Sequence, residues 1–180
     1  MNIGFDLDKV FINYPPFISP RLIDRFYKNE SAEKLTYRIP NQPEQIFRNL
    51  SHLPILRRPI KNNIAFLEKL VSNKNNKYYL ISSRYSFLRK RTENVVKKYK
   101  LDAIFDGLYF NYNNLQAHEF KDDKIKTLKI NIYIDDDLAL LKYLATNNKS
   151  VKFYWLNPQV QKKLSTNLFA ITSLQGVFQN

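Results

Sequence analysis

Between residues 60 and 156 the sequence alternates between short apolar runs and longer segments whose apolar residues recur at helical spacing. A further apolar run, residues 3–7, precedes this part of the chain. Parallel strands need long crossovers, which are usually helical and right-handed. The pattern therefore predicts an α/β fold in three layers, with a central parallel sheet between helices.

The expected elements are short and follow one another closely. A length of 180 residues and a hydrophobic content of 44% fit one globular domain with a small insertion. The predicted strands cover residues 3–7, 78–81, 104–110, 132–134 and 151–156, the last of these ending the sheet. The predicted helices cover residues 60–71, 87–99, 120–128 and 138–145.

The segment after the first strand lacks this alternation. Pro15 and Pro16 interrupt regular structure, and Ser19 followed by proline predicts a helix that ends near Tyr27. Asn41 marks the start of a second helix. We therefore expect a small helical insertion. Its predicted range is 14–58, within a core made of residues 1–13 and 59–180.

Polar side chains gather where the predicted strands end. Asp6 and Asp8 follow the first strand and project to the same side, so their charges repel unless a cation lies nearby. Ser82 ends the second strand, and three aspartates beginning at Asp135 end the fourth. Because ligands of open α/β sheets bind at these ends, the carboxylates predict a Mg²⁺ site, with Lys121 supplying further positive charge.

These residues resemble the motifs of the haloacid dehalogenase (HAD) superfamily of phosphatases. Residues 6–10 match Asp-x-Asp-x-Thr/Val, Ser82 matches the hydroxyl that ends an apolar strand, and Lys121 matches the lysine of the third motif. Asp135 and Asp136 match the acidic pair of the fourth. The resemblance implies a Rossmann-like core with a central parallel sheet, and a cap inserted after the first strand.

The resemblance also implies a two-step phosphoryl transfer. Asp6 would attack phosphorus and carry the phosphoryl group until water hydrolyses it. Asp8 would transfer protons to the leaving oxygen and from water, which requires a pKa near the working pH. Ser82 would bind a phosphate oxygen, and Lys121 would neutralise charge. Mg²⁺ would be held by Asp6, Asp135 and the backbone carbonyl of Asp8, and Asp136 would complete the metal site by supporting the water shell of the ion.

Substrate-binding roles fall to residues beside these motifs. Ser83 and Arg84 follow Ser82, and this tripeptide resembles the branch that contains 5'-deoxyribonucleotidases. Lys9 stands where the family often has glycine, and it either contacts substrate or points outward. Lys124, one helical turn after Lys121, is a rival for the third motif.

Composition narrows the chemistry further. The chain has no cysteine and only two histidines, His52 and His118, which excludes thiolate and histidine-rich metal sites. Each histidine is expected to be a surface or capping residue, and Asp137 a helix N-cap. Three glycines exclude a glycine-rich phosphate loop. Without a long apolar run, we expect a soluble cytoplasmic protein with no membrane partner.

The predicted function is Mg²⁺-dependent hydrolysis of a small phosphorylated metabolite, such as a nucleotide. The net charge of +13 and the basic segment 86–100 support an alternative, a phosphatase of nucleic-acid ends or a non-catalytic nucleic-acid-binding protein of this fold. A signalling receiver domain also joins acidic residues, a hydroxyl and a lysine. It is excluded because its phosphorylated aspartate ends a middle strand, whereas here the chain stays apolar beyond Asp106.

Overall fold

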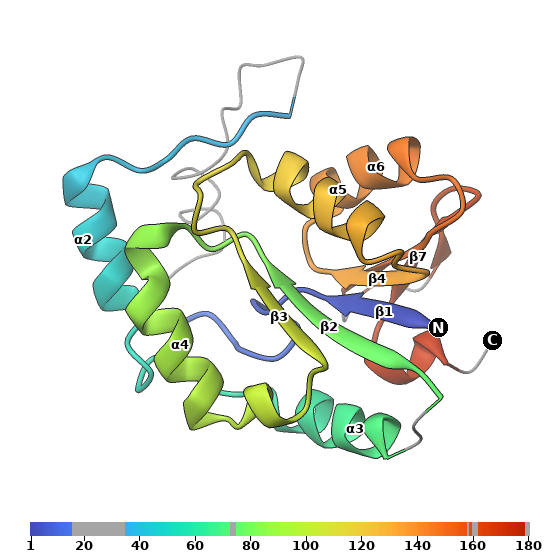
Figure 1. The fold of residues 1–180 in the computed structure, drawn as a ribbon, viewed down its shortest axis with the longest axis horizontal. Helices are drawn as coiled ribbons and strands as arrows, with labels where there is room; N and C mark the ends of the chain where they lie inside the picture. Colours follow the sequence, from blue (N-terminus) through green and yellow to red (C-terminus); the bar gives the residue numbers. More distant parts are fainter. Residues whose placement is uncertain (16–34, 73–74, 158, 160–161, 179–180) are drawn as a thin grey trace.

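The computed structural model describes residues 1–15, 35–72, 75–157, 159 and 162–178, and these form a sheet covered by helices (Figure 1). Within them the sheet has seven strands in the order β3-β2-β1-β4-β5-β7-β6, parallel except for the pair β6 and β7. The predicted α/β class is confirmed. The strands are β1 (Asn2–Phe5), β2 (Lys77–Ser82), β3 (Gly107–Phe110), β4 (Ile132–Asp135), β5 (Lys152–Leu156), β6 (Lys162–Lys163) and β7 (Leu168–Ile171).

Helices cover both faces of the sheet. In Figure 1, α5 and α6 lie above it, and α3 and α4 lie below it. Two groups of buried apolar side chains correspond to these faces, one including Leu67 of α3 and Val95 of α4, the other Phe120 of α5 and Leu141 of α6. The α-helices are α2 (Gln42–Ser51), α3 (Lys61–Val71), α4 (Arg89–Lys98), α5 (Ala117–Thr127) and α6 (Leu138–Asn147). Short 3-10 helices are η1 (Ser86–Leu88), η2 (Leu101–Ala103) and η3 (Leu174–Val177).

The middle of the sheet is packed tightly around β1. Ile3 and Phe5 are fully buried, and both belong to the core on the α3 and α4 side. Gly4 faces the opposite side, where a Cβ atom would lie 2.8 Å from a ring carbon of Tyr133. Glycine is therefore needed for this close approach. The packing fixes the end of β1, from which Asp6 projects.

Three details differ from the sequence prediction. The strand expected at residues 104–110 begins only at Gly107, because Ile104 is the C-cap of η2 (Leu101–Ala103) and has helical backbone angles. The helix expected at residues 87–99 starts as the 3-10 turn η1. The sheet continues past β5, since β7 pairs with β5 in parallel register. The sequence prediction misses β7 because none of the described residues between β5 and β7 forms a helix, so the alternation of strand and helix ends at β5.

The inserted segment leaves and re-enters the core at one place. Ile12 forms an antiparallel bridge with Pro59, and the amide of Asn13 donates to the carbonyl of Arg58 at 2.8 Å. The described part of the insertion contains α2, which starts after Asn41 as predicted, and this N-cap residue forms a capping box with Glu44. The helix expected near Tyr27 lies outside the described residues.

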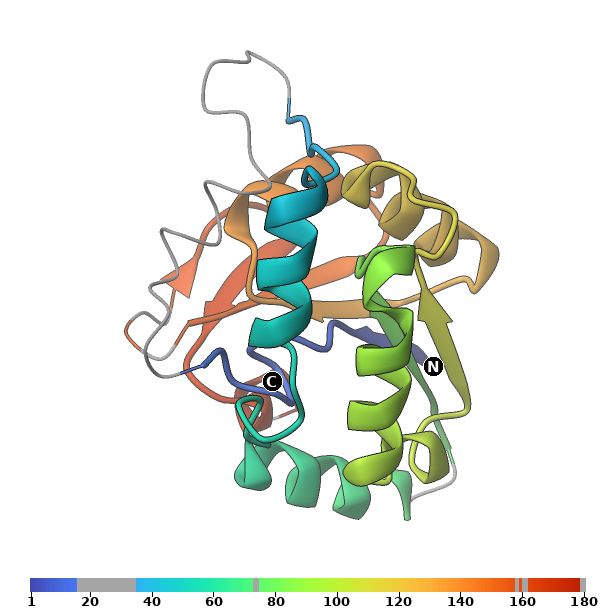
Figure 2. The same ribbon diagram turned by 90° about the vertical axis from the view of Figure 1, so that its left-hand side faces the viewer.

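Helix α2 runs beside α4 at the surface, as both views show (Figures 1 and 2). The side-chain amide of Asn49 donates to the carbonyl of Phe87 at 3.0 Å, which ties α2 to η1. None of the described helices combines the length and the hydropathy needed to cross a membrane.

Candidate active site

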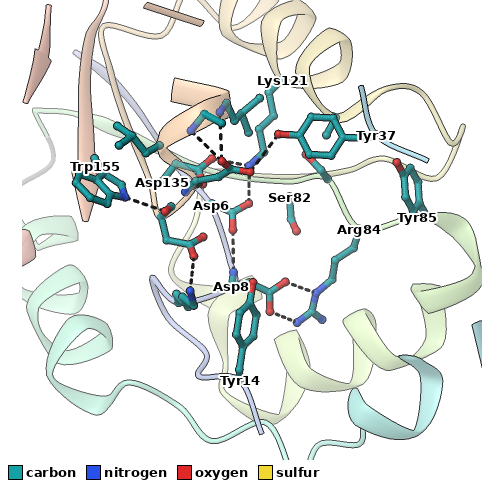
Figure 3. A pocket seen from close by; sticks show the side chains of 18 of the residues that line it. Asp6, Asp8, Tyr14, Tyr37, Ser82, Arg84, Tyr85, Lys121, Asp135 and Trp155 are labelled. Atoms are coloured by element: carbon teal, nitrogen blue, oxygen red, sulfur yellow. Dashed lines mark hydrogen bonds and ion pairs between the residues drawn. The ribbon is translucent and has the colours of Figure 1, made fainter. Parts of the chain in front are cut away.

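A cavity of about 330 Å³ opens where β1, β2 and β4 end (Figure 3). Its wall is formed by residues at or just after these strand ends, by α5 and by the insertion. Every site residue predicted from the sequence lines this one cavity: Asp6, Asp8, Lys9, Ser82, Ser83, Arg84, Lys121, Asp135 and Asp136.

Lys121 joins two of the strand ends. Its Nζ donates to Oδ1 of Asp6 at 2.8 Å and to Oδ2 of Asp135 at 2.6 Å. Burial alone would lower the pKa of Lys121, but Asp135 and Asp6 raise it well above its ordinary value, so the ammonium is charged. Lys124 instead pairs with Asp123 near the surface. Of the two candidate lysines, the structure brings Lys121 to the site.

Asp6 is buried among groups of both signs. Its Oδ2 accepts the backbone amide of Asp8 at 2.9 Å. Burial raises the pKa of Asp6 most, Lys121 lowers it, and Asp135 and Asp8 raise it again, to about 7. Lys121 therefore offsets only part of the combined effect of burial and of the neighbouring carboxylates on Asp6.

Asp136 completes an acidic cluster with Asp6 and Asp135. One carboxylate oxygen from each of the three lies within 4.8 Å of the others. Burial and the neighbouring Asp135 raise the pKa of Asp136 well above its ordinary value, although Lys9 acts against them. Oxygen donors this close together suit a hard divalent cation such as Mg²⁺.

Lys9 contributes to the wall of the site. Its backbone has a φ of 54°, in the left-handed region, and its Nζ lies 3.2 Å from Oδ2 of Asp136. The same Nζ is 4.8 Å from the centroid of the Tyr14 ring. The structure therefore places the Lys9 ammonium on the acidic cluster, although the side chain is partly exposed.

Two arginines hold Asp8. Arg84 donates from Nε to Oδ2 at 2.9 Å and from Nη2 to Oδ1 at 2.8 Å, and Arg57 donates from Nη1 to Oδ1 at 3.0 Å. Burial would raise the pKa of Asp8, but Arg84 and Arg57 hold it well below its ordinary value. The expectation that this pKa lies near the working pH is therefore wrong for this arrangement.

Arg57 is a site residue that sequence reasoning misses. It is fully buried, and its Nε donates to the carbonyl of Ser51 at 3.1 Å. Its Nη2 lies 2.6 Å from Nε2 of His52, and its carbonyl accepts the hydroxyl of Tyr99 at 2.7 Å. Arg57 thus joins the end of α2 to Asp8. The sequence shows only a basic residue before Arg58 and a proline, which gives no signal of this role.

His52 differs from its expected place in one respect. It is the C-cap of α2, as a capping residue would be, but its side chain is fully buried and not at the surface. Burial lowers the pKa of His52 well below its ordinary value, and the charges of Arg57, Arg84 and Arg48 lower it further. The imidazole is therefore neutral at physiological pH.

Hydroxyl groups lie between the acidic and basic ends of the cavity. Ser82 is buried at the end of β2, and the buried hydroxyl of Ser83 has no hydrogen-bond partner among the residues that the structure describes. Both could donate to an anion in the cavity. Asp137 caps α6 by accepting the amides of Ala139 and Leu140, which confirms the predicted N-cap.

Aromatic side chains form the remaining wall. Tyr14, Tyr37, Tyr85 and Trp155 all line the cavity and surround its charged residues in Figure 3. The Tyr37 hydroxyl donates to Asp137 at 3.1 Å, and Trp155 Nε1 donates to the carbonyl of Asp136 at 2.9 Å. Sequence spacing assigns most aromatics to the core and does not single out these four.

Comparisons with known proteins agree on the architecture. A HAD family enzyme from Bacteroides thetaiotaomicron aligns with a TM-score of 0.62 at 14% identity, over 99% of this chain and 98% of that one. That enzyme is an aspartate-to-alanine mutant in complex with magnesium and inorganic phosphate. A haloacid dehalogenase-like family hydrolase from Streptococcus pneumoniae aligns with a TM-score of 0.57 at 14% identity, over 87% and 84%. The chain has the HAD-like fold.

A HAD-superfamily hydrolase from Ehrlichia chaffeensis shares this fold, with a TM-score of 0.55 at 12% identity over 98% of this chain and 93% of that one. No family model matches the sequence. No curated protein matches it either. The HAD-like fold agrees with the resemblance seen in the motifs of residues 6–10 and 135–136.

Proposed function

We propose that the chain is a Mg²⁺-dependent phosphomonoester hydrolase that acts on a small phosphorylated metabolite, such as a nucleotide. The observation that carries this proposal is the bridge from Lys121 to Asp6 and Asp135 beside the carboxylate of Asp136. It joins a nucleophile, a cation site and a fixed ammonium at the ends of parallel strands. The fold of a HAD family enzyme solved with magnesium and phosphate supports the same reaction class.

Asp6 is the proposed nucleophile. Its carboxylate would form a bond to phosphorus while the bond from phosphorus to the leaving oxygen breaks, and water would then cleave the aspartyl-phosphate. Lys121 would neutralise charge on the carboxylate and on the phosphoryl oxygens, since it already contacts Asp6. Ser82 and Ser83 would donate hydrogen bonds to those oxygens.

The residues present fit a magnesium ion. Asp6, Asp135 and Asp136 would hold it, together with the carbonyl of Asp8, because their carboxylate oxygens already lie close together. When bound, Mg²⁺ supplies positive charge that attracts the phosphate and stabilises its transfer.

Asp8 is the proposed proton-transfer residue. Its place beside Asp6 suits this role, but both of its oxygens accept hydrogen bonds from arginine. Donation of a proton to the leaving oxygen would therefore require that these bonds weaken when substrate binds. Arg84, which lines the cavity, could exchange Asp8 for an anionic group of the substrate.

We further propose that residues 14–58 act as a cap that selects the leaving group. Tyr14, Tyr37 and Arg48 belong to this segment and line the cavity. A planar nucleobase could stack on such tyrosines, and a guanidinium could bind a polar or anionic part of the leaving group. These contacts support a nucleotide over a small alkyl phosphate.

A panel of phosphomonoesters tests the proposal. The panel contains nucleoside monophosphates, sugar phosphates, an aryl phosphate and 5'- and 3'-phosphorylated oligonucleotides. Each substrate is incubated with the protein and either Mg²⁺ or chelator, and phosphate release is measured. We expect Mg²⁺-dependent release from nucleotides, lost in Asp6→Asn and retained in the surface control Asp102→Asn. Release from none of the substrates would refute the proposal. Release from oligonucleotide ends alone would favour the second candidate, which the basic helix α4 supports.

A further inference from the structure

Helix α2 is amphipathic in an unusual sense, because its polar side faces the protein and its apolar side faces solvent. Arg48 and Ser51 are buried, whereas Ile46 is 65% exposed and Leu50 is 54% exposed. Ile55, in the turn after α2, is 77% exposed. Exposed apolar side chains that gather on one side of a protein can mark a binding surface, here next to a basic helix. We call Ile46, Leu50 and Ile55 the apolar stripe.

A basic helix lies next to the apolar stripe. Figure 2 shows α2 and α4 side by side at the surface with their axes nearly parallel. Lys98 donates from Nζ to the carbonyl of Pro54 at 3.1 Å, which places its ammonium beside Ile55. Arg58, a few residues after the stripe, is also exposed.

The outer side of α4 adds more positive charge. Thr92, Val95 and Val96 face inward, which leaves Lys90 and Lys97 exposed on the opposite side. The helix carries five cationic side chains, Arg89, Lys90, Arg91, Lys97 and Lys98, against the single carboxylate of Glu93. That carboxylate is already paired with Arg89 at 2.9 Å.

We propose that the apolar stripe and the basic side of α4 together bind an anionic lipid membrane surface. Isoleucine and leucine would enter the boundary between headgroups and acyl chains, while the lysines beside them contact lipid phosphates. The inference does not depend on the proposed hydrolase activity. It assigns a role to the net charge of +13, which the cavity does not use.

Other occupants suit this surface less well. A second copy of the chain would bring two proteins of charge +13 together, so electrostatic repulsion opposes it. A nucleic acid backbone would pair with the lysines but would leave the apolar stripe without a function. The expectation of no membrane partner comes from the lack of a long apolar run, and that criterion detects spanning segments but not a surface stripe.

Vesicle sedimentation tests the proposal with the full chain. The protein is mixed with neutral vesicles of phosphatidylcholine or with anionic vesicles that also contain phosphatidylglycerol. Each mixture is centrifuged at low and at physiological salt concentration. We expect binding to the anionic vesicles only. The double variant Ile46→Gln/Leu50→Gln should bind about tenfold less tightly or worse. Lys97→Gln/Lys98→Gln should weaken binding by about tenfold and reduce its salt dependence.

Matched controls separate a defined surface from general attraction. Lys142→Gln/Lys149→Gln removes the same charge from exposed positions at and after α6, and Leu115→Gln removes an exposed leucine elsewhere. These controls should bind like the wild type, and thermal unfolding checks that every variant folds. No binding to anionic vesicles would overturn the proposal, whatever other polyanion the protein binds. Equal losses of vesicle binding in the control variants would also overturn the proposal. A loss of binding in Lys97→Gln/Lys98→Gln with no loss in Ile46→Gln/Leu50→Gln would overturn it as well.

Discussion

Replacing Asp6 and Asp8 one at a time by asparagine should change the stability of the metal-free protein in opposite directions. The two carboxylates are two residues apart in sequence, but their surroundings differ. Asp6 lies near Asp135 and Asp136, with Lys121 as its cation, whereas Asp8 faces the guanidinium groups of Arg57 and Arg84. The first carboxylate is buried and lies beside further negative charge, and the second compensates positive charge.

The magnitude for Asp6 follows from its pKa. A value of about 7 in the folded protein, against an ordinary 3.8, means that ionised Asp6 lowers the free energy of unfolding by about 4 kcal/mol at pH 8. This cost is a net one, because the pKa of about 7 already includes the charge and the hydrogen bond of Lys121, which lower it, so asparagine removes the cost without a further loss of that charged contact. The gain is therefore up to about 4 kcal/mol, or roughly 8–16 °C in Tm.

The effect for Asp8 has the other sign. Asp8→Asn leaves the buried guanidinium groups of Arg57 and Arg84 facing a neutral amide. Removing one partner of a buried ion pair costs about 3–5 kcal/mol. Because the pKa of Asp8 is lowered by folding, the stability it contributes is present above about pH 4, the ordinary carboxyl pKa, and is lost as pH falls further.

Thermal unfolding in chelator from pH 4 to pH 8 measures both variants. A raised pKa means that folded Asp6 binds more protons than the unfolded chain, so its contribution falls as pH rises from about 4 to 7. The Tm of Asp6→Asn relative to wild type should therefore increase over this range and become positive by pH 8. Asp102→Asn, at an exposed position, is the control. An Asp6→Asn protein that melts below wild type at pH 8 would refute the net cost of the buried, ionised Asp6. An Asp8→Asn protein that melts with wild type would refute the compensating role of Asp8.

Three further predictions concern turnover. Lys121→Met should lower kcat by about a hundredfold or more, because it removes a fixed charge from the reacting groups. The kcat of Lys124→Met should stay close to that of the wild type. Equal effects of the two substitutions in steady-state assays would contradict the assignment of Lys121 to the site. Asp135→Ala should abolish both the Mg²⁺-dependent rise in Tm and the activity, and a variant that still responds to Mg²⁺ in calorimetry would place the ion elsewhere. Arg48→Gln should raise KM for nucleotides and leave hydrolysis of a small aryl phosphate almost unchanged; similar losses on both substrates would argue against a leaving-group contact.

The sequence is sufficient to predict the acidic side of the site because local features determine it. Asp6 and Asp135 each end a short apolar strand, and parallel strands bring their carboxyl ends to one edge. Lys121 could be separated from Lys124 only by geometry, since both lie on α5. The strand β7 escapes prediction because no helix among the described residues separates it from β5, so the alternation of strand and helix on which the prediction rests stops there.

The basic side of the site could not be predicted in the same way. Arg57 reaches Asp8 across 49 positions of sequence, and this contact depends on how the insertion folds back onto the core. The lowered pKa of Asp8 depends on that contact, so a motif that names Asp8 cannot give its protonation state. Tyr14 and Tyr37 enter the cavity wall for the same tertiary reason.

Covalent phosphorylation of Asp6 is the central claim, and trapping it is the most direct test. Enzyme turning over its best substrate with Mg²⁺ is quenched in acid, digested and analysed by mass spectrometry. We predict one added phosphoryl group on the N-terminal peptide that contains Asp6, removable by hydroxylamine and absent from Asp6→Asn. Covalent phosphorylation of Asp6 would be contradicted if phosphate is released rapidly while that peptide stays unmodified at every quench time. Undiminished turnover by Asp6→Asn would contradict it too.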